Sequence, residues 1–235
     1  LQLIVGSEVR LDDGPRLVLL ARNHDGYSDL CRLITSGRRR GAKGRYRLAC
    51  ADAESLGDGV LVLWVPAAGD PRRESEAAHD DAHGAWVARR FAGRAWLAVE
   101  LHRGADDAAR LACLRRLGER FGLPLVAAGD VHMHLRRRRA LQDVLTAIRL
   151  GCTVAEAGHA LFPNGERHLR RIDDLARALC GQRRADCPDA PPGQQPVALP
   201  FTVRENQRAV ADQCRFIHFS HLVRTHGCHH LGQHD

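Results

Sequence analysis

Short apolar runs alternate with helix-like stretches over roughly the first 130 residues of the chain. Five runs are long enough to be strands, at residues 3–7, 16–21, 60–65, 96–101 and 124–128. The run VLVLWV at 60–65 is apolar throughout, which is typical of parallel strands buried on both faces. Strands and helices in this alternation predict an α/β domain built on a parallel sheet or barrel.

Helical spacing fills the intervals between the strands. Residues 25–35 predict a helix with one face made of Tyr27, Leu30, Cys31 and Ile34, and residues 83–91 predict another. A third helix follows Asp106 and Asp107, repeats Leu111, Leu114, Leu117 and Phe121, and ends at Gly122. Further along, Leu141, Val144, Leu145 and Ile148 predict one apolar helix face, closed by Gly151.

The composition divides the chain into four segments. We expect the α/β domain over 1–135, a mainly helical connection over 136–180, and a linker over 181–204 that carries five of the 10 prolines. A short helix at 204–214 and a divergent tail complete the segment 205–235. The tail holds six of the 14 histidines and resembles a frameshifted reading more than a metal-binding tract. The first residue is Leu1 rather than methionine, which suggests a fragment.

Composition narrows the class of protein. Hydrophobic residues make up 44% of the chain and charged residues 27%, which predicts a folded core and excludes a collagen-like or wholly disordered chain. No apolar run is long enough to span a membrane, and the start does not resemble a signal peptide. The eight cysteines form no C-x-x-C pair, so we expect reduced thiols and a cytoplasmic protein.

The net charge of +7 is modest for this length, and Lys43 is the only lysine. An arginine bias of this kind reflects a GC-rich genome as readily as nucleic-acid binding. Two basic runs stand out, at 37–47 and at 136–139. The first, with Arg38, Arg39, Arg40 and Lys43, could bind phosphates of a nucleic acid, or could be a solvated loop after a helix.

The strongest chemical signal is Gly129-Asp130-Val131-His132, directly after the run at 124–128. Residues two apart in an extended chain point to one side, so Asp130 and His132 would project together from the carboxyl end of a strand. A carboxylate and an imidazole in this arrangement suit zinc or manganese. The alternative is a strand end whose polar groups are simply hydrogen-bonded.

Two further strand ends carry similar residues. Glu8 follows Gly6 and Ser7, while Glu100 and His102 lie two apart at the end of the run 96–101. A carboxylate in an apolar strand needs a basic or metal partner unless the strand end is solvated. Glu8, His102, Asp130 and His132 therefore form a candidate ligand set from three strand ends.

Several long segments resemble one family. They are LIVGSEVRLDDGPRLVLLARNHDGYSDLCRLIT, GRYRL, the stretch from AWLAVELHRG through GDVHMH to RLGCTV, and ALFPNGERHLR. Together they cover most of 1–171 and are similar to the N-terminal region of bacterial C-family DNA polymerases, in particular the error-prone alpha-subunit type. That region is a PHP (polymerase and histidinol phosphatase) domain.

The resemblance implies a distorted β/α barrel with a metal cluster, here incomplete because the family's opening histidine motifs do not occur in this sequence. Glu8 takes the place of an acidic ligand, Asp130 and His132 that of the aspartate-x-histidine pair, and His102 is a further ligand. The segment 1–135 would then be a partial PHP domain. The palm carboxylates that polymerisation requires, together with magnesium, are also absent from this sequence.

The resemblance thus implies a fragment of an error-prone polymerase that acts on DNA and deoxynucleotides in damage-induced synthesis, with other replication or mutagenesis proteins as partners and no membrane. Two alternatives remain open at this point. One is a free-standing, metal-dependent PHP phosphoesterase, and the other is a non-catalytic docking module.

Overall fold

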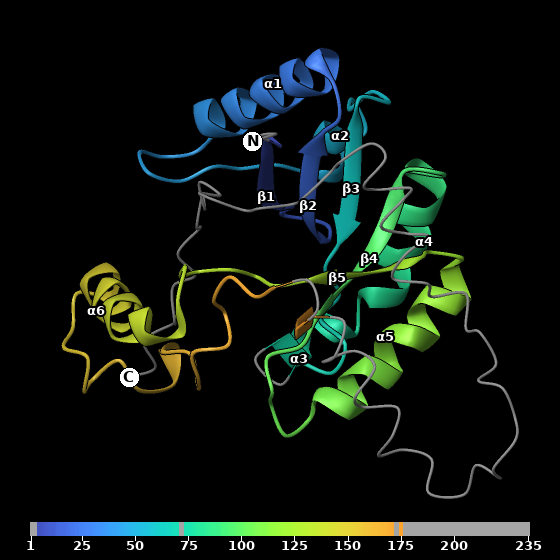
Figure 1. Ribbon diagram of the computed structural model, residues 1–235. Helices are drawn as coiled ribbons and strands as arrows, with labels where there is room; N and C mark the ends of the chain where they lie inside the picture. The colour runs from blue at the N-terminus through green and yellow to red at the C-terminus, as the bar shows by residue number, and fades with distance from the viewer. Residues whose placement is uncertain (1–3, 71–72, 172–173, 176–235) are drawn as a thin grey trace, which may run out of the picture. The chain divides into compact units, whose positions relative to one another are not determined.

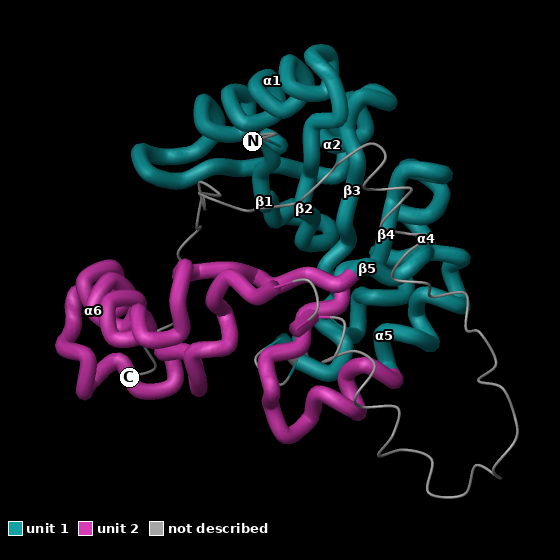
Figure 2. The backbone as a smooth tube through the Cα atoms, in the orientation of Figure 1, with its two compact units in different colours: residues 1–98, 113–126, 199–235 teal, residues 99–112, 127–198 magenta. Residues whose placement is uncertain are grey.

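The computed structural model describes residues 4–70, 73–171 and 174–175, and the linker and tail expected beyond residue 180 lie outside this part of the chain. The described residues form two compact units, which Figure 2 colours separately. Unit 1 comprises residues up to 98 and 113–126, and unit 2 comprises 99–112 and the residues from 127 onward. The four expected segment boundaries stay predictions.

Five strands form one open sheet in the order β1-β2-β3-β4-β5 (Figure 1). Their bounds are Gly6–Arg10, Arg16–Ala21, Val60–Trp64, Ala95–Glu100 and Leu125–Ala128. The last two residues of β4 and of β5 belong to unit 2. The fold is therefore mixed α/β, as expected in class.

The sheet is mixed rather than parallel, which corrects the sequence-based expectation. β1 and β2 form an antiparallel hairpin with Arg10 opposite Arg16, and β2 is also antiparallel to β3. β3 and β4 form a parallel ladder, with Leu63 facing Trp96. The turn at 11–15 is too short for a crossover helix, so the first two strands had to pair antiparallel.

β1 lies three residues later than predicted. Its burial alternates, with Ser7 and Val9 buried and Glu8 and Arg10 partly exposed, as in a strand with one covered face. Glu8 is consequently in the middle of β1, opposite Val18, and not at a strand end. The apolar start at 3–5 drew the prediction toward the terminus, whereas the pairing with β2 decides where the strand lies.

The helices of unit 1 cover this sheet. They are α1 (His24–Arg40), α2 (Cys50–Ala53), α3 (Glu74–Ala77), α4 (Asp80–Arg90) and α5 (Asp107–Phe121), the last beginning in unit 2. α1 packs against β2 and β3 (Figure 1). Asn23 caps it by accepting a hydrogen bond from the Gly26 amide at 2.9 Å.

The buried face of α1 differs from the predicted one. Leu30 and Leu33 are buried together with Gly26 and Gly37, whereas Tyr27 and Cys31 are exposed. The two glycines shift the contact face because they allow the helix backbone to approach its neighbours closely. A Cβ atom on Gly26 would lie 1.8 Å from the carbonyl oxygen of Gly59, which is backbone and cannot turn aside.

Unit 1 encloses an apolar core made by β2, β3 and β4. β3 is buried along its whole length, and Trp64 and Phe91 have no exposed surface. The Trp64 ring meets Phe121 edge to face, with centroids 6.3 Å apart. Burial on both faces explains why these strands are uninterrupted apolar runs rather than alternating ones.

Unit 2 contains the turn η2 (Arg136–Arg138), helix α6 (Arg139–Leu150) and the turn η3 (Gly158–Ala160). α6 ends as predicted at Gly151, whose φ of 70° is in the left-handed region that favours glycine. The predicted apolar face of α6 exists and is largely exposed, from 44% for Val144 to 70% for Ile148. No helix in the described part of the chain is long and apolar enough to cross a membrane.

The close approach at Gly26 is testable. Gly26→Ala is expected to lower the free energy of unfolding by about 3 kcal/mol, because the new methyl group meets backbone. Urea unfolding followed by circular dichroism measures this loss. Thr35→Ala, an exposed position in the same helix, serves as the control and should change stability by less than about 0.5 kcal/mol. Equal stabilities of the two variants would contradict the packing described here.

Candidate functional site

Asp130 and His132 lie close together in unit 2, in the loop that follows β5. Asp130 Oδ1 is 3.4 Å from His132 Nε2, and each side chain is only 9% exposed. The backbone at Asp130 is not extended, since its φ is 39°. The two side chains therefore meet because the chain turns at Asp130, and not because residues alternate along a strand as the sequence analysis assumed.

A third residue, which the sequence analysis did not single out, completes this pair. Arg167 NH1 forms an ion pair with Asp130 Oδ2, and the two side chains are 16% and 9% exposed. The Arg167 guanidinium also lies 4.4 Å from the centre of the Phe162 ring. Phe162 in turn meets the His132 ring edge to face, with centroids 4.6 Å apart. These four side chains form the Asp130 cluster.

Backbone hydrogen bonds hold Arg167 in this position. The His132 amide donates to the Arg167 carbonyl at 2.8 Å, and the Leu169 amide donates to the Met133 carbonyl at 3.0 Å. Met133 and His168 form a parallel bridge at the same point. The segment 162–170 thus lies alongside the loop after β5, joined to it by these hydrogen bonds and a single β-bridge.

The same segment is also tied to the loop after β4. Asn164 Nδ2 donates to the His102 carbonyl at 2.7 Å, and Asn164 Oδ1 accepts from the Glu166 amide at 3.0 Å. The buried Glu166 faces Arg136 at 2.6 Å and Arg103 at 3.5 Å. The sequence singled out this segment only through its resemblance and did not predict these contacts, because the partners outside the segment are 30 to 63 residues away along the chain.

His102 lies just beyond β4 and close to the Asp130 loop. Its Nε2 is 3.2 Å from the Gly129 carbonyl oxygen, which can only accept, so Nε2 carries the proton. Burial lowers the pKa of His102 to about 3, and the charges of Arg167, Arg170 and Arg110 act in the same direction. The imidazole is therefore neutral at ordinary pH and already uses Nε2 in a hydrogen bond.

Glu8 belongs to unit 1, where it lies on strand β1. Its Oε1 is 3.8 Å from Arg16 NH1, and the two side chains are 15% and 17% exposed. Glu100, the other strand carboxylate considered in the sequence analysis, is 8% exposed at the end of β4. Each of the two acidic candidate ligands, Glu8 and Asp130, therefore has an arginine beside it.

As arranged here, the candidate ligands do not fit a divalent metal ion. Asp130 is paired with a guanidinium, His102 donates through Nε2, and three arginines make the surroundings of His102 electropositive. A metal site needs ionised carboxylates and unprotonated ring nitrogens turned to one point. Among the described residues, no group of three or more histidine, cysteine, aspartate or glutamate side chains is arranged to hold a metal ion.

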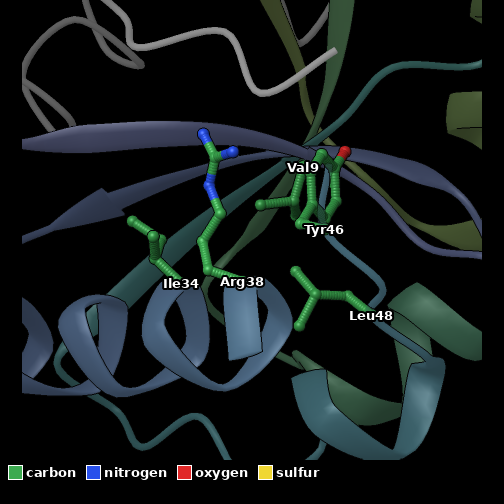
Figure 3. Close-up of a pocket in the computed structure, with 5 residues that line it drawn as sticks. All are labelled: Val9, Ile34, Arg38, Tyr46 and Leu48. Atoms are coloured by element: carbon green, nitrogen blue, oxygen red, sulfur yellow. The ribbon is translucent and has the colours of Figure 1, made fainter. Parts of the chain in front are cut away.

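The basic run after α1 is only partly available to a ligand. Arg40 NH1 forms a pair of hydrogen bonds with both carboxylate oxygens of Asp52, at 2.7 and 2.6 Å. The Arg38 side chain lines a small pocket with Tyr46, Val9, Ile34 and Leu48 (Figure 3). Arg39 and Lys43 are exposed. Of the four predicted nucleic-acid-binding residues, these two are therefore best placed to contact an anion.

Two of the four arginines in the second basic run lie beside carboxylates. Arg136 pairs with Glu166, and Arg139 Nε lies 3.5 Å from Asp143 Oδ2 on the next turn of α6. Positive charge at a helix start is unfavourable for the helix dipole, and these two carboxylates offset part of that charge.

The brace around Asn164 predicts a local effect. Asn164→Ala removes two hydrogen bonds to partly buried groups, and should lower stability by about 1–2 kcal/mol. The amides of His132 and Leu169 should exchange with deuterium at least about tenfold faster, since they depend on the braced segment. His159→Ala, at an exposed position in η3, is the control. Unchanged exchange at both amides would show that Asn164 does not hold the segment in place.

Comparison with known proteins identifies the class. No family model matches the chain. A protein of Pseudomonas savastanoi pv. phaseolicola is 56% identical over 176 residues, which are 75% of this chain and 17% of that protein. One of Methylococcus capsulatus is 47% identical over 216 residues, 92% of this chain and 18% of the relative. One of Pseudomonas aeruginosa is 55% identical over 174 residues, 74% of this chain and 16% of the relative.

All three relatives are DNA polymerases, so the chain is related to one part of a bacterial DNA polymerase. Each of them is named an error-prone DNA polymerase, and this chain is similar to one part of them, as the resemblance in its sequence predicted. The chain spans about one sixth of the length of these relatives.

Proposed function

We propose that this chain is a part of an error-prone DNA-directed DNA polymerase that synthesises DNA across lesions after damage. The 56% identity over 176 residues to such a polymerase is the observation that carries this proposal. The complete protein would act on DNA and deoxynucleotides in the cytoplasm, together with other replication or mutagenesis proteins. Its nucleotidyl transfer would depend on magnesium ions held by palm carboxylates.

Within that polymerase, we propose that the PHP-like part contributes structure rather than hydrolysis. The ion pair between Arg167 and Asp130 supports this, because it uses the carboxylate that a hydrolytic metal would need. A metal-dependent phosphoesterase is the less favoured alternative. It would require the same Asp130 and His132 to coordinate zinc or manganese and to activate water.

A docking role is the second candidate, and one observation favours it. Leu141, Leu145 and Ile148 on α6 are 51%, 53% and 70% exposed, and Val144 beside them is 44% exposed. Contiguous exposed apolar side chains on a helix are typical of a protein-binding surface. The remaining five sixths of the polymerase would be the natural partner of this face.

A chimeric polymerase tests the main proposal. The corresponding 176 residues of the Pseudomonas savastanoi polymerase would be replaced by those of this chain. Primer extension by the chimera should stay within about tenfold of the parent, a difference of about 1.4 kcal/mol. The 235-residue chain alone should extend no primer. A folded chimera without extension activity, beside an active parent, would contradict the proposal.

Two further assays separate the alternatives. Hydrolysis of a phosphodiester by the isolated chain in the presence of Mn²⁺, lost in Asp130→Ala, would favour the phosphoesterase. Leu145→Asp with Ile148→Asp in the chimera should reduce primer extension if α6 is a docking face. The same pair of changes in the isolated chain should leave its melting temperature unchanged, because both side chains are largely exposed.

We also propose that Arg39 and Lys43 contact DNA phosphates. Arg39→Ala with Lys43→Ala removes two exposed positive charges, and should reduce the slope of log K against log salt for duplex DNA by about 1.8. Fluorescence anisotropy with a labelled primer-template measures this slope in the chimeric polymerase. Arg89→Ala with Arg116→Ala, two exposed positions on α4 and α5, removes the same charge elsewhere. A larger effect of this control pair would show that Arg39 and Lys43 do not bind DNA.

A further inference from the structure

The Asp130 cluster combines a carboxylate and an imidazole, as a metal site does. Its positive charge comes from the Arg167 side chain. One carboxylate oxygen of Asp130 meets Arg167, and the other lies 3.4 Å from His132 Nε2. Two ligand atoms bound to a tetrahedral zinc ion, each about 2.0–2.1 Å from it, are separated by about 3.3 Å. Asp130 and His132 therefore keep the separation of a ligand pair while a guanidinium supplies the positive charge.

We infer that Arg167 occupies the position of a cation in this cluster, so that unit 2 keeps its structure without any metal ion. The guanidinium is well suited to this position because it is permanently charged and planar. It binds the carboxylate through N–H groups and lies against the face of Phe162 through its π system. This inference concerns unit 2 itself and does not depend on the polymerase proposal.

Two features around Arg167 indicate that its position is built into the fold. The Arg167 carbonyl accepts hydrogen bonds from the amides of His132 and Met133, at 2.8 and 3.2 Å, so its backbone is anchored beside the carboxylate it pairs with. The neighbouring Glu166 pairs with two other arginines, Arg103 and Arg136, whereas Arg167 pairs with Asp130. The pair is thus assembled by backbone pairing, and not by two mobile surface side chains.

A carboxylate beside an arginine also occurs in unit 1. Glu8, the other acidic residue at a predicted ligand position, has Arg16 NH1 3.8 Å from its carboxylate. Both side chains are less than one fifth exposed. An arginine beside each acidic candidate ligand is expected if positive side chains stand in for metal ions, and is unfavourable if metal ions are to bind there.

Thermal unfolding of four forms of the chain tests the inference. These are the unchanged chain, Arg167→Leu, Asp130→Asn and the double variant Asp130→Asn with Arg167→Leu. The melting temperature of the unchanged chain should be the same with EDTA and with added Zn²⁺. Arg167→Leu should melt roughly 5–10 °C lower, because it leaves a buried carboxylate without its counter-charge. The double variant should recover more than half of that loss, because neither charge is then buried alone.

Zinc distinguishes the cation position from an ordinary ion pair. Added Zn²⁺ should restore at least half of the lost melting temperature in Arg167→Leu, and nothing in the double variant, which lacks the carboxylate. Arg171→Leu, which removes an exposed arginine four residues away, is the control and should respond to neither EDTA nor zinc. If Arg167→Leu does not fold, Arg167→Lys, which keeps the charge, should fold and melt closer to the unchanged chain.

Three outcomes would overturn the inference. The first is a purified chain that contains stoichiometric metal and melts at a lower temperature in EDTA. The second is an Arg167→Leu variant as stable as the unchanged chain. The third is a destabilised Arg167→Leu variant that does not respond to zinc, which would restrict Arg167 to an ordinary ion pair.

Discussion

A carboxylate that is removed from water needs a positive neighbour, and this requirement organises unit 2 around Asp130 and Glu166. A buried carboxylate without a partner would destabilise the fold by several kcal/mol or take up a proton. The brace segment 162–170 meets the requirement twice, because Arg167 pairs with Asp130 and Glu166 pairs with arginines from two other loops. The loops after β4 and β5 are held by the same short segment as a result.

In unit 1, a buried arginine is stabilised by hydrogen bonds to backbone carbonyl oxygens. Arg94 is 8% exposed, and its guanidinium donates to the carbonyl oxygens of Leu56, Gly57 and Val60 at 2.7 to 3.1 Å. It also lies 5.0 Å from the centre of the Phe91 ring. The Arg94 side chain thereby satisfies backbone carbonyl groups beside an apolar core, in which β3 is buried over its full length. Apolar burial stabilises the folded state of this unit, and the buried charge of Arg94 forms hydrogen bonds with backbone carbonyl oxygens.

These two uses of charge bear on what such a chain can contribute to a polymerase. The acidic residues at the candidate ligand positions, Glu8 and Asp130, each have an arginine of the same chain beside them. Two exposed features remain for interactions. One is the pair of Arg39, in the last turn of α1, and Lys43, just after α1, and the other is the apolar face of α6. Both surfaces suit a part that binds other components of a larger protein. The relatives are about six times as long as the matched segment.

Much of the local structure could be predicted from the sequence, because it depends on near neighbours in the chain. The strands at β2, β3, β4 and β5 and the end of α6 at Gly151 follow from apolar runs and from the conformational freedom of glycine. The pairing of Asp130 with His132 was also predicted, although for the wrong backbone reason. The long motifs were specific enough to identify the relatives, since identity of this extent does not arise from composition.

The sequence by itself therefore determined the class of fold, most element positions and the kinship with error-prone polymerases. The tertiary structure alone decided that the sheet is mixed, that Glu8 lies within β1, and that the α1 face follows its glycines. It also decided that Arg167, 37 residues from Asp130, supplies the charge at the candidate site. The physical reason is the same in each case. Strand direction, close backbone approach and the partner of a buried charge depend on groups far apart in the chain, which no local pattern of residues encodes.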